Sequence, residues 1–143
     1  MKITEPASAE EFEQYYELRW KILRAPWNQV RGSERDADDE TSTHLMVMDD
    51  KNKLIGVGRL HFNSIREAQI RFMAIEVHEQ RKGVGTYLLQ ALEARAEKHG
   101  ASHITLDARE TALGFYRKQG YSPQGPGHTL FNSIAHVTMT KAL

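Results

Sequence analysis

The chain has 143 residues, 40% of them hydrophobic and 27% charged, which suits one soluble globular domain with its own core. Its 19 basic residues equal its 19 acidic ones, so no overall field draws it to nucleic acid or to an anionic membrane. Cysteine is absent, which excludes disulfides, thiolate metal sites and a cysteine nucleophile, and no apolar run reaches the ~20 residues that span a bilayer, so we expect a cytoplasmic protein.

The N-terminal half predicts one long helix and four strands. Ser8 and Glu11 have the spacing of a capping box, which starts an amphipathic helix that ends before Pro26. The polar, acid-rich stretch 28–43 predicts a loop with a short helix. The strands predicted in this half cover residues 2–4, 44–50, 53–62 and 68–77.

The C-terminal half predicts two helices among the remaining strands. Apolar residues recur at helical spacing from Val84 to Ala96, so one face of a helix that ends at His99 should pack on a sheet. A strand at 102–108, a short helix at 109–120, an irregular return from 121 and a last strand at 133–140 follow. This order predicts an α/β (α+β) domain, with one mixed, mostly antiparallel sheet of about seven strands flanked by about four helices.

A basic turn that contains Gly83 and Gly85 stands at the start of the second long helix. A helix N-terminus has unpaired N–H groups and the positive end of the dipole, and glycine lets a phosphate approach the backbone. The P-loop pattern requires Lys and Ser/Thr after its second glycine, and the Rossmann pattern requires a third glycine where Leu88 stands. Both patterns fit this turn poorly.

The segment Gln80–Gly85 has the form Q/R-x-x-G-x-G/A, which resembles the acetyl-CoA pyrophosphate loop of the GCN5-related N-acetyltransferases (GNAT). The resemblance covers nearly the whole chain. "RFMAIEVHEQRKGVGTYLLQALE" resembles the family's fourth strand, loop and third helix, and "ITLDARETALGFYRKQGY" resembles its fifth strand and fourth helix.

Other segments resemble one bacterial subgroup in which this domain is often fused to a hotdog thioesterase domain. They are "LRWKILRAPWNQVRGSERDADDE", "GVGRL", "IRFMAI" and "IAHVTM". The chain looks like a free-standing version, with residues 1–143 as one acetyltransferase domain.

The resemblance implies a site for acetyl-CoA as co-substrate. The backbone of Met73, Ala74 and Ile75 should pair with the pantetheine arm, and an N–H group near Ile75 should contact the thioester carbonyl. The implied pyrophosphate cradle consists of Gln80, Arg81, Lys82, Gly83, Val84, Gly85 and Thr86. The alternative for Met73, Ala74 and Ile75 is that they are ordinary side chains of a buried strand. The alternative for the cradle is an ordinary turn between a strand and a helix.

Tyr116 matches the tyrosine that protonates the departing CoA thiolate in this family, and core packing beside Phe115 is its alternative role. Arg109 replaces an asparagine that contacts the cofactor in relatives. Arg109 and Lys118 are interpreted either as ligands of a CoA phosphate or as solvated charges.

The sequence assigns no general base. Gln69 stands where histone-acetylating relatives have a glutamate, and it cannot accept a proton. Histidine has an ordinary pKa of about 6.5, so His136 could accept a proton near neutral pH; the alternative is a structural role. The full set of candidates is His44, Glu76, Asp107 and His136.

The acidic segment Asp36–Glu40 lies in the region that covers the acceptor in this family. It is interpreted either as attracting a cationic amine or as a loop stabilised by Arg31 and Arg35.

The predicted reaction is metal-free acetyl transfer from acetyl-CoA to a primary amine on a small molecule or peptide, by direct attack in a ternary complex. The alternative is a non-catalytic CoA- or acyl-CoA-binding sensor or partner module. Nucleic-acid binding is disfavoured because there is no basic stripe. The acceptor and the oligomeric state stay open, with a homodimer through an exposed sheet edge as one alternative.

Overall fold

In the computed structural model, which describes residues 1–143, seven strands form one sheet in the order β1-β2-β3-β4-β5-β7-β6. Neighbouring strands are antiparallel except β4 and β5, which are parallel, so the predicted mixed, mostly antiparallel sheet is confirmed. The strands are β1 (Lys2–Thr4), β2 (Thr43–Met48), β3 (Leu54–Phe62), β4 (Glu67–Ile75), β5 (His103–Arg109), β6 (Ser122–Leu130) and β7 (Ile134–Ala142).

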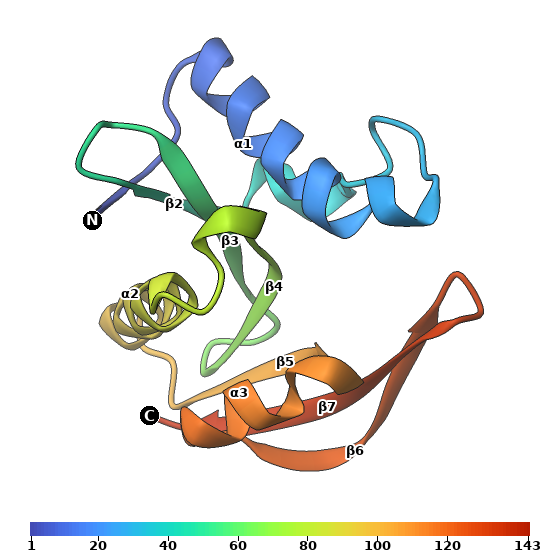
Figure 1. Cartoon of the computed structure of the whole chain (residues 1–143). Coiled ribbons are helices and arrows are strands. Elements are labelled where there is room, and N and C mark those ends of the chain that lie inside the picture. Colours follow the sequence, from blue (N-terminus) through green and yellow to red (C-terminus); the bar gives the residue numbers. More distant parts are fainter.

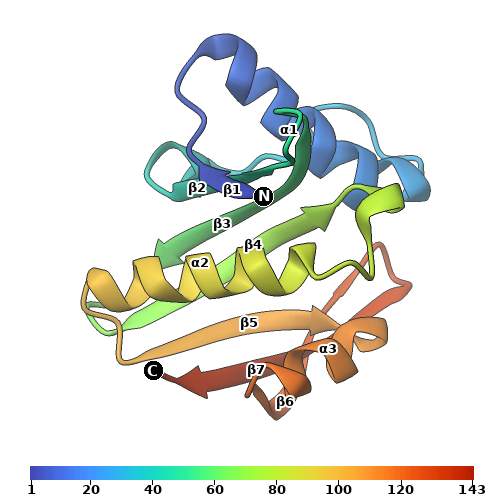
Figure 2. The same cartoon turned by 60° about the vertical axis from the view of Figure 1, so that its left-hand side comes forward.

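Three α-helices cover the two faces of the sheet (Figures 1 and 2). Helix α1 (Ala9–Leu23) packs on one face, and α2 (Val84–Lys98) and α3 (Leu113–Lys118) pack on the other. None of them is long and apolar enough to cross a membrane. The capping box predicted for α1 is confirmed, because the Glu11 N–H donates to Ser8 Oγ and the Ser8 N–H donates to Glu11 Oε1, both at 3.0 Å.

The prediction of about four helices is wrong by one. The stretch between α1 and β2 forms two 3₁₀ turns, η1 (Ala25–Trp27) and η2 (Ala37–Glu40), instead of an α-helix. An amphipathic helix needs a repeating apolar stripe, which this stretch lacks. The short turn η2 is held by its own capping box between Asp36 and Asp39.

The irregular return predicted from residue 121 is also wrong, because strand β6 begins at Ser122. It contains Pro123 and Pro126 and pairs with β7 through two irregularities in register. Proline removes a ladder donor and is tolerated only at sheet edges and bulges, and β6 is an edge strand. The prolines therefore mark a sheet edge here and not a loop.

A buried network of charges joins α1, η2 and β3. Arg19 and Arg59 are fully buried, and each donates from Nη1 to Asp39 Oδ1 at 3.0 Å. Arg59 also binds Asp36. Burial alone would raise the pKa of Asp39, but Arg19, the Asp36 N–H and Arg59 outweigh it and hold that pKa below its ordinary value. The acidic segment thus neutralises arginines of the protein itself.

One of the two interpretations of this acidic segment needs correction. Arg31 binds Glu13 at 3.0 Å and Arg35 binds Glu34 at 3.1 Å, so neither is the expected partner. Asp36 and Asp39 are engaged by buried guanidinium groups, whereas Asp38 and Glu40 are exposed, so the attraction of a cationic amine by this segment stays a prediction. The ion-pair partners of Asp36 and Asp39 come from distant parts of the chain, so spacing along the sequence does not identify them.

Candidate active site

A cleft opens where strands β4 and β5 separate. The two strands pair only over Glu67–Gln69 and His103–Thr105, and beyond these residues their facing edges have no strand partner. The resulting cleft of about 670 Å³ is lined by β4, β5, α3, the start of α2, the end of α1 and residues of β6 and β7. Two open strand edges that face each other provide backbone groups with which an extended ligand can pair.

Strand β4 bends at this opening. Val57 pairs with Ala74 and Arg59 with Arg71, so Phe72 and Met73 together lie opposite the single residue Gly58. Phe72 has φ of 57°, in the left-handed region, which identifies a β-bulge. The bulge turns β4 away from β5, and it leaves the side chains of Met73 and Ile75 in the cleft. Ala74 is 1% exposed and packs against α1.

The Ile75 N–H group points toward the open edge of β4. The next N–H group, that of Glu76, donates to Ile55 O on β3 at 2.9 Å. Because N–H directions alternate along a strand, the Ile75 N–H faces away from β3. It is therefore a donor on the cleft side.

The turn between β4 and α2 presents six consecutive N–H groups, from Arg81 to Thr86, that donate to no protein acceptor. Arg81 and Gly83 have φ of 64° and 85°, which curves the backbone so that successive N–H groups converge. Gly83 is required for this φ. A Cβ at Gly85 would lie 3.4 Å from the Phe115 ring, which is an ordinary contact, so packing against α3 does not by itself require glycine there.

The predicted cradle residues divide into three kinds. Gln80 donates from Nε2 to Ile75 O at 3.1 Å, which ties the turn to the end of β4. Lys82 has a side chain that is 62% exposed and does not line the cleft, and Val84 is 2% exposed in the core. The remaining members line the cleft directly, namely Arg81, Gly83, Gly85 and Thr86.

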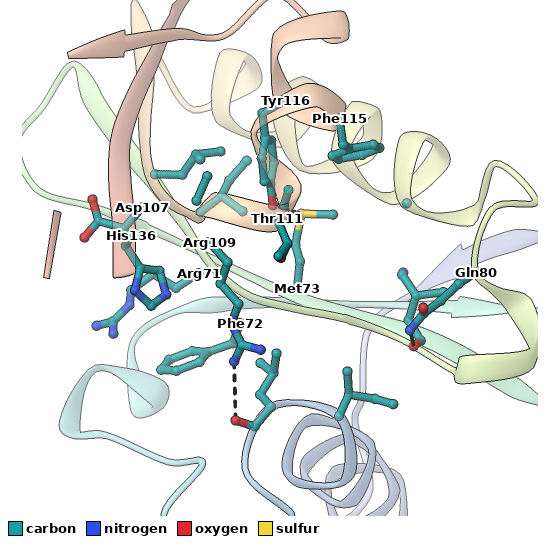
Figure 3. A pocket seen from close by; sticks show the side chains of 18 of the residues that line it. Arg71, Phe72, Met73, Gln80, Asp107, Arg109, Thr111, Phe115, Tyr116 and His136 are labelled. Carbon is teal, nitrogen blue, oxygen red and sulfur yellow. Dashed lines mark hydrogen bonds between the residues drawn. The ribbon is translucent and has the colours of Figure 1, made fainter. Parts of the chain in front are cut away.

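Tyr116 reaches the cleft from α3, and its hydroxyl donates to Met73 Sδ at 3.6 Å (Figure 3). Burial raises the pKa of Tyr116 to about 12, so the phenol is protonated throughout the neutral range. The side chain is therefore a hydrogen-bond donor in the wall of the cleft, close to the bulge in β4.

The candidate bases occupy different parts of the molecule. His44 is buried between the Tyr15 hydroxyl (2.8 Å) and Asp39 O (2.7 Å), and Glu76 binds Lys21 at 2.8 Å outside the cleft. Only Asp107 and His136 line the cleft. Gln69, which occupies the position of the missing glutamate, accepts from Asn63 near the closed end of the two strands.

His136 is held with one ring nitrogen free. Its Nδ1 donates to His128 O at 3.1 Å and to Ile134 O at 3.0 Å, which leaves Nε2 unprotonated in the neutral ring. Burial, together with the neighbouring His128, lowers the pKa of His136. The two rings stack with centroids 4.2 Å apart. The ring is therefore neutral at pH 7, with an available lone pair.

Several polar cleft residues were missed in the sequence, among them His128, Arg24 and Arg71. His128 donates from Nδ1 to Asp107 Oδ2 at 3.0 Å, and Thr138 donates to Asp107 Oδ1 at 2.7 Å. Arg24, from the end of α1, also lines the cleft. His128 belongs to the segment read as an irregular return and Arg24 to a helix terminus, so neither position had a recognisable chemical pattern.

Arg109 is half-buried in the cleft, and its guanidinium lies 4.5 Å from the Trp27 ring. It donates to Leu23 O at 3.4 Å (Figure 3). It is therefore not a solvated charge, whereas Lys118 is exposed at the end of α3 and outside the cleft.

Comparisons with known proteins agree with this architecture. Residues 9–143 match the family described as Acetyltransferase (GNAT) domain. The chain is 28% identical over 141 residues to the uncharacterized N-acetyltransferase YjcF of Bacillus subtilis (strain 168), with 99% of both proteins covered.

Solved structures show the same fold. A candidate N-acetyltransferase from Lactobacillus plantarum has a TM-score of 0.86 at 23% identity, covering 99% of this chain and 97% of that one. An aminoglycoside 6'-N-acetyltransferase complexed with coenzyme A has a TM-score of 0.80 at 17% identity, with the same coverage. Escherichia coli ElaA has a TM-score of 0.81 at 16% identity, covering 98% and 97%. The family match over nearly the whole sequence, on this fold, shows that the chain belongs to the GNAT acetyltransferase family.

Proposed function

We propose that the protein transfers an acetyl group from acetyl-CoA to a primary amine, with residues 1–143 acting as one acetyltransferase domain. The observation that carries this proposal is the run of six unpaired N–H groups beside the separated strands. The run suits a pyrophosphate, since the positive end of the α2 dipole and the Arg81 side chain add favourable charge. The strand opening suits the extended pantetheine arm.

Acetyl-CoA would lie with its pyrophosphate at Arg81–Thr86 and its pantetheine along Met73–Ile75. Gln80 would position this turn, and Lys82 and Val84 would contribute main-chain N–H groups only. The Ile75 N–H would donate to the thioester oxygen as negative charge develops there.

The reaction would be a direct attack, because the chain has no cysteine to carry an acyl group. The amine nitrogen forms a bond to the thioester carbon, and the C–S bond breaks. As the C–N bond forms, the nitrogen becomes acidic and gives its proton to His136 Nε2. The thiolate leaves with a hydrogen bond from the Tyr116 hydroxyl. Asp107 and His128 would hold the His136 ring in place.

Substituting Tyr116 by phenylalanine should lower kcat about 10- to 100-fold and leave the KM for acetyl-CoA nearly unchanged. A hydrogen bond to a charged group contributes about 1.5–3 kcal/mol, and this one forms only as the thiolate develops. Steady-state kinetics with a thiol reagent measures both constants. Tyr87→Phe is the matched control, since Tyr87 lies on α2 and its hydroxyl binds Met1 O. Equal kcat values in wild type and Tyr116→Phe would remove this role.

A thermal-shift titration with acetyl-CoA, CoA and NAD⁺ in parallel tests the binding part of the proposal. A ligand at ~100 times its Kd adds about 2.7 kcal/mol of stability, which is several degrees for a domain of this size. We expect stabilisation by acetyl-CoA and CoA but not by NAD⁺. The absence of a shift with both CoA species would reject the site.

The alternative is a sensor that binds acyl-CoA without transferring the acyl group. It would give the same thermal shift, but it would not release the free thiol of CoA when an amine is added. The free Nε2 of His136 and the retained Tyr116 favour the enzyme. The finer resemblance, to the subgroup often fused to a hotdog thioesterase domain, stays a prediction.

A further inference from the structure

Three arginines gather at the end of the cleft that lies away from the glycine turn. Arg24 comes from the end of α1, Arg71 from β4 and Arg109 from the end of β5. Figure 3 shows Arg71 and Arg109 beside Phe72, on the same side of the cleft as His136. Three cations from separate parts of the chain therefore face the region where an acceptor amine would bind.

The protein balances these charges only in part. Arg71 lies 3.6 Å from Asp36, but Asp36 also binds the buried Arg59. Arg24 and Arg109 form no ion pair at all. Arg24 donates to Ser33 O at 3.1 Å and to Leu23 O at 3.0 Å, and Arg109 donates only to Leu23 O.

The cleft offers no spare carboxylate to neutralise them. Asp107 is the one acidic residue in its lining, and both of its oxygens already accept hydrogen bonds, from His128 and Thr138. Arg24 is 8% exposed, and its Nη2 has no hydrogen-bond partner. Burial, followed by repulsion from Arg109, Arg71 and Arg19, lowers the pKa of Arg24, and the buried Glu34, which is paired with Arg35, opposes this only in part. A buried cation among like charges is unfavourable until an anion binds beside it.

Aromatic rings hold the guanidinium groups in position. The guanidinium of Arg109 lies 4.5 Å from the Trp27 ring, and that of Arg24 lies 5.5 Å from Phe131 and 5.7 Å from Phe72. A guanidinium stacked on a ring keeps its N–H edge free, and that edge matches the paired oxygens of a carboxylate or phosphate.

The anion site and the proposed base are direct neighbours. Arg109 and His136 are paired across β5 and β7, where the Cβ atoms of directly opposite residues are about 4.5–5.5 Å apart. An anionic group at Arg109 would therefore lie only a few bonds from an amine at His136 Nε2.

We propose that the acceptor is a small primary amine that carries a carboxylate or phosphate, with the anion bound by Arg24 and Arg109 and the amine beside His136. This inference rests on the proposed acetyl transfer and names its substrate class. It disfavours polycationic acceptors, because a second ammonium group would lie against uncompensated guanidinium groups.

Matched amine pairs test the proposal by kinetics. The pairs are β-alanine with β-alaninamide and O-phosphoethanolamine with ethanolamine, and spermidine serves as a polycation. We expect kcat/KM to be at least 10-fold higher for the anionic member of one pair or both, and the pair with the larger ratio distinguishes carboxylate from phosphate. A preference for the neutral member or for spermidine, with transfer intact, would overturn the inference and leave the proposed function standing.

Variants of Arg109 test whether the preference for the anionic amine arises at the proposed anion site. Arg109→Gln should lower kcat/KM for the anionic amine about 10- to 100-fold, mainly through KM, and change the neutral amine little. Arg109→Lys should recover part of the loss because it keeps the charge. Arg66→Gln is the matched control, since Arg66 is exposed in the turn between β3 and β4. Equal losses for both members of a pair would contradict an anion site.

A binding measurement separates the two proposals when no amine of the panel is acetylated. The protein is saturated with CoA, so that the glycine turn is filled, and titrated with sodium phosphate and with β-alanine at constant ionic strength. A rise in Tm in wild type and Arg66→Gln but not in Arg109→Gln would support the anion site independently of transfer. No Arg109-dependent rise would overturn it.

Discussion

Asp39→Asn should destabilise the protein by about 3–5 kcal/mol, the typical cost of removing one partner of a buried ion pair. The substitution keeps the shape of the side chain but leaves the fully buried Arg19 and Arg59 without their shared carboxylate. For a domain of this size the loss corresponds to a fall in Tm of about 10 °C or more. Thermal or urea unfolding measures it.

Asp38→Asn is the control for this result, because Asp38 lies in the same 3₁₀ turn and is exposed. It should change the free energy of unfolding by no more than about 0.5 kcal/mol. The pKa of Asp39 is lowered in the folded protein, so its contribution is present at neutral pH and is lost as the pH falls through that lowered pKa. Equal stability of Asp39→Asn and wild type would show that the network is not needed for the fold.

His136→Asn should lower kcat/KM by about 10²–10⁴-fold, the usual contribution of a general base. Asparagine can place its amide N–H near the position of Nδ1, so the bonds to His128 O and Ile134 O are kept while the free Nε2 is lost. His99→Asn, at the exposed end of α2, is the matched control.

The pH dependence sharpens this test. The substrate amine titrates identically with both proteins, so the ratio of wild-type to variant kcat/KM reports His136 alone. Because the pKa of His136 is lowered, the ratio should be constant near neutral pH and fall only below the ordinary value of 6.5. A ratio that does not change with pH, or a variant with wild-type activity, would exclude His136 as the base.

The sequence predicted the elements whose causes are local. The capping box at Ser8, the glycine turn before α2 and the three successive strands β2 to β4 are each set by short stretches of sequence, and each is present in the structure. Proline was misread in β6, because its meaning depends on whether a strand lies at an edge, and sheet order is a tertiary property.

The polar groups of the cleft were harder to predict, because they meet only in three dimensions. Arg24 and Arg109 are far apart in sequence but share the Leu23 carbonyl, and the roles of Asp107 and His136 depend on His128 in a neighbouring strand. The bulge at Phe72 exposes Met73 to the cleft, and no residue type in "IRFMAI" signals it.

Mass spectrometry with isotope-labelled acetyl-CoA is the decisive test of the proposed acetyl transfer. The protein is incubated with the labelled donor and a mixture of β-alanine, O-phosphoethanolamine and their neutral partners, and the mass of each amine is measured. We expect an anionic amine to gain one labelled acetyl group with wild type, and to gain it far more slowly with His136→Asn. Tight binding of acetyl-CoA, with none of these amines labelled faster than without the protein, would contradict transfer to them and favour the binding module.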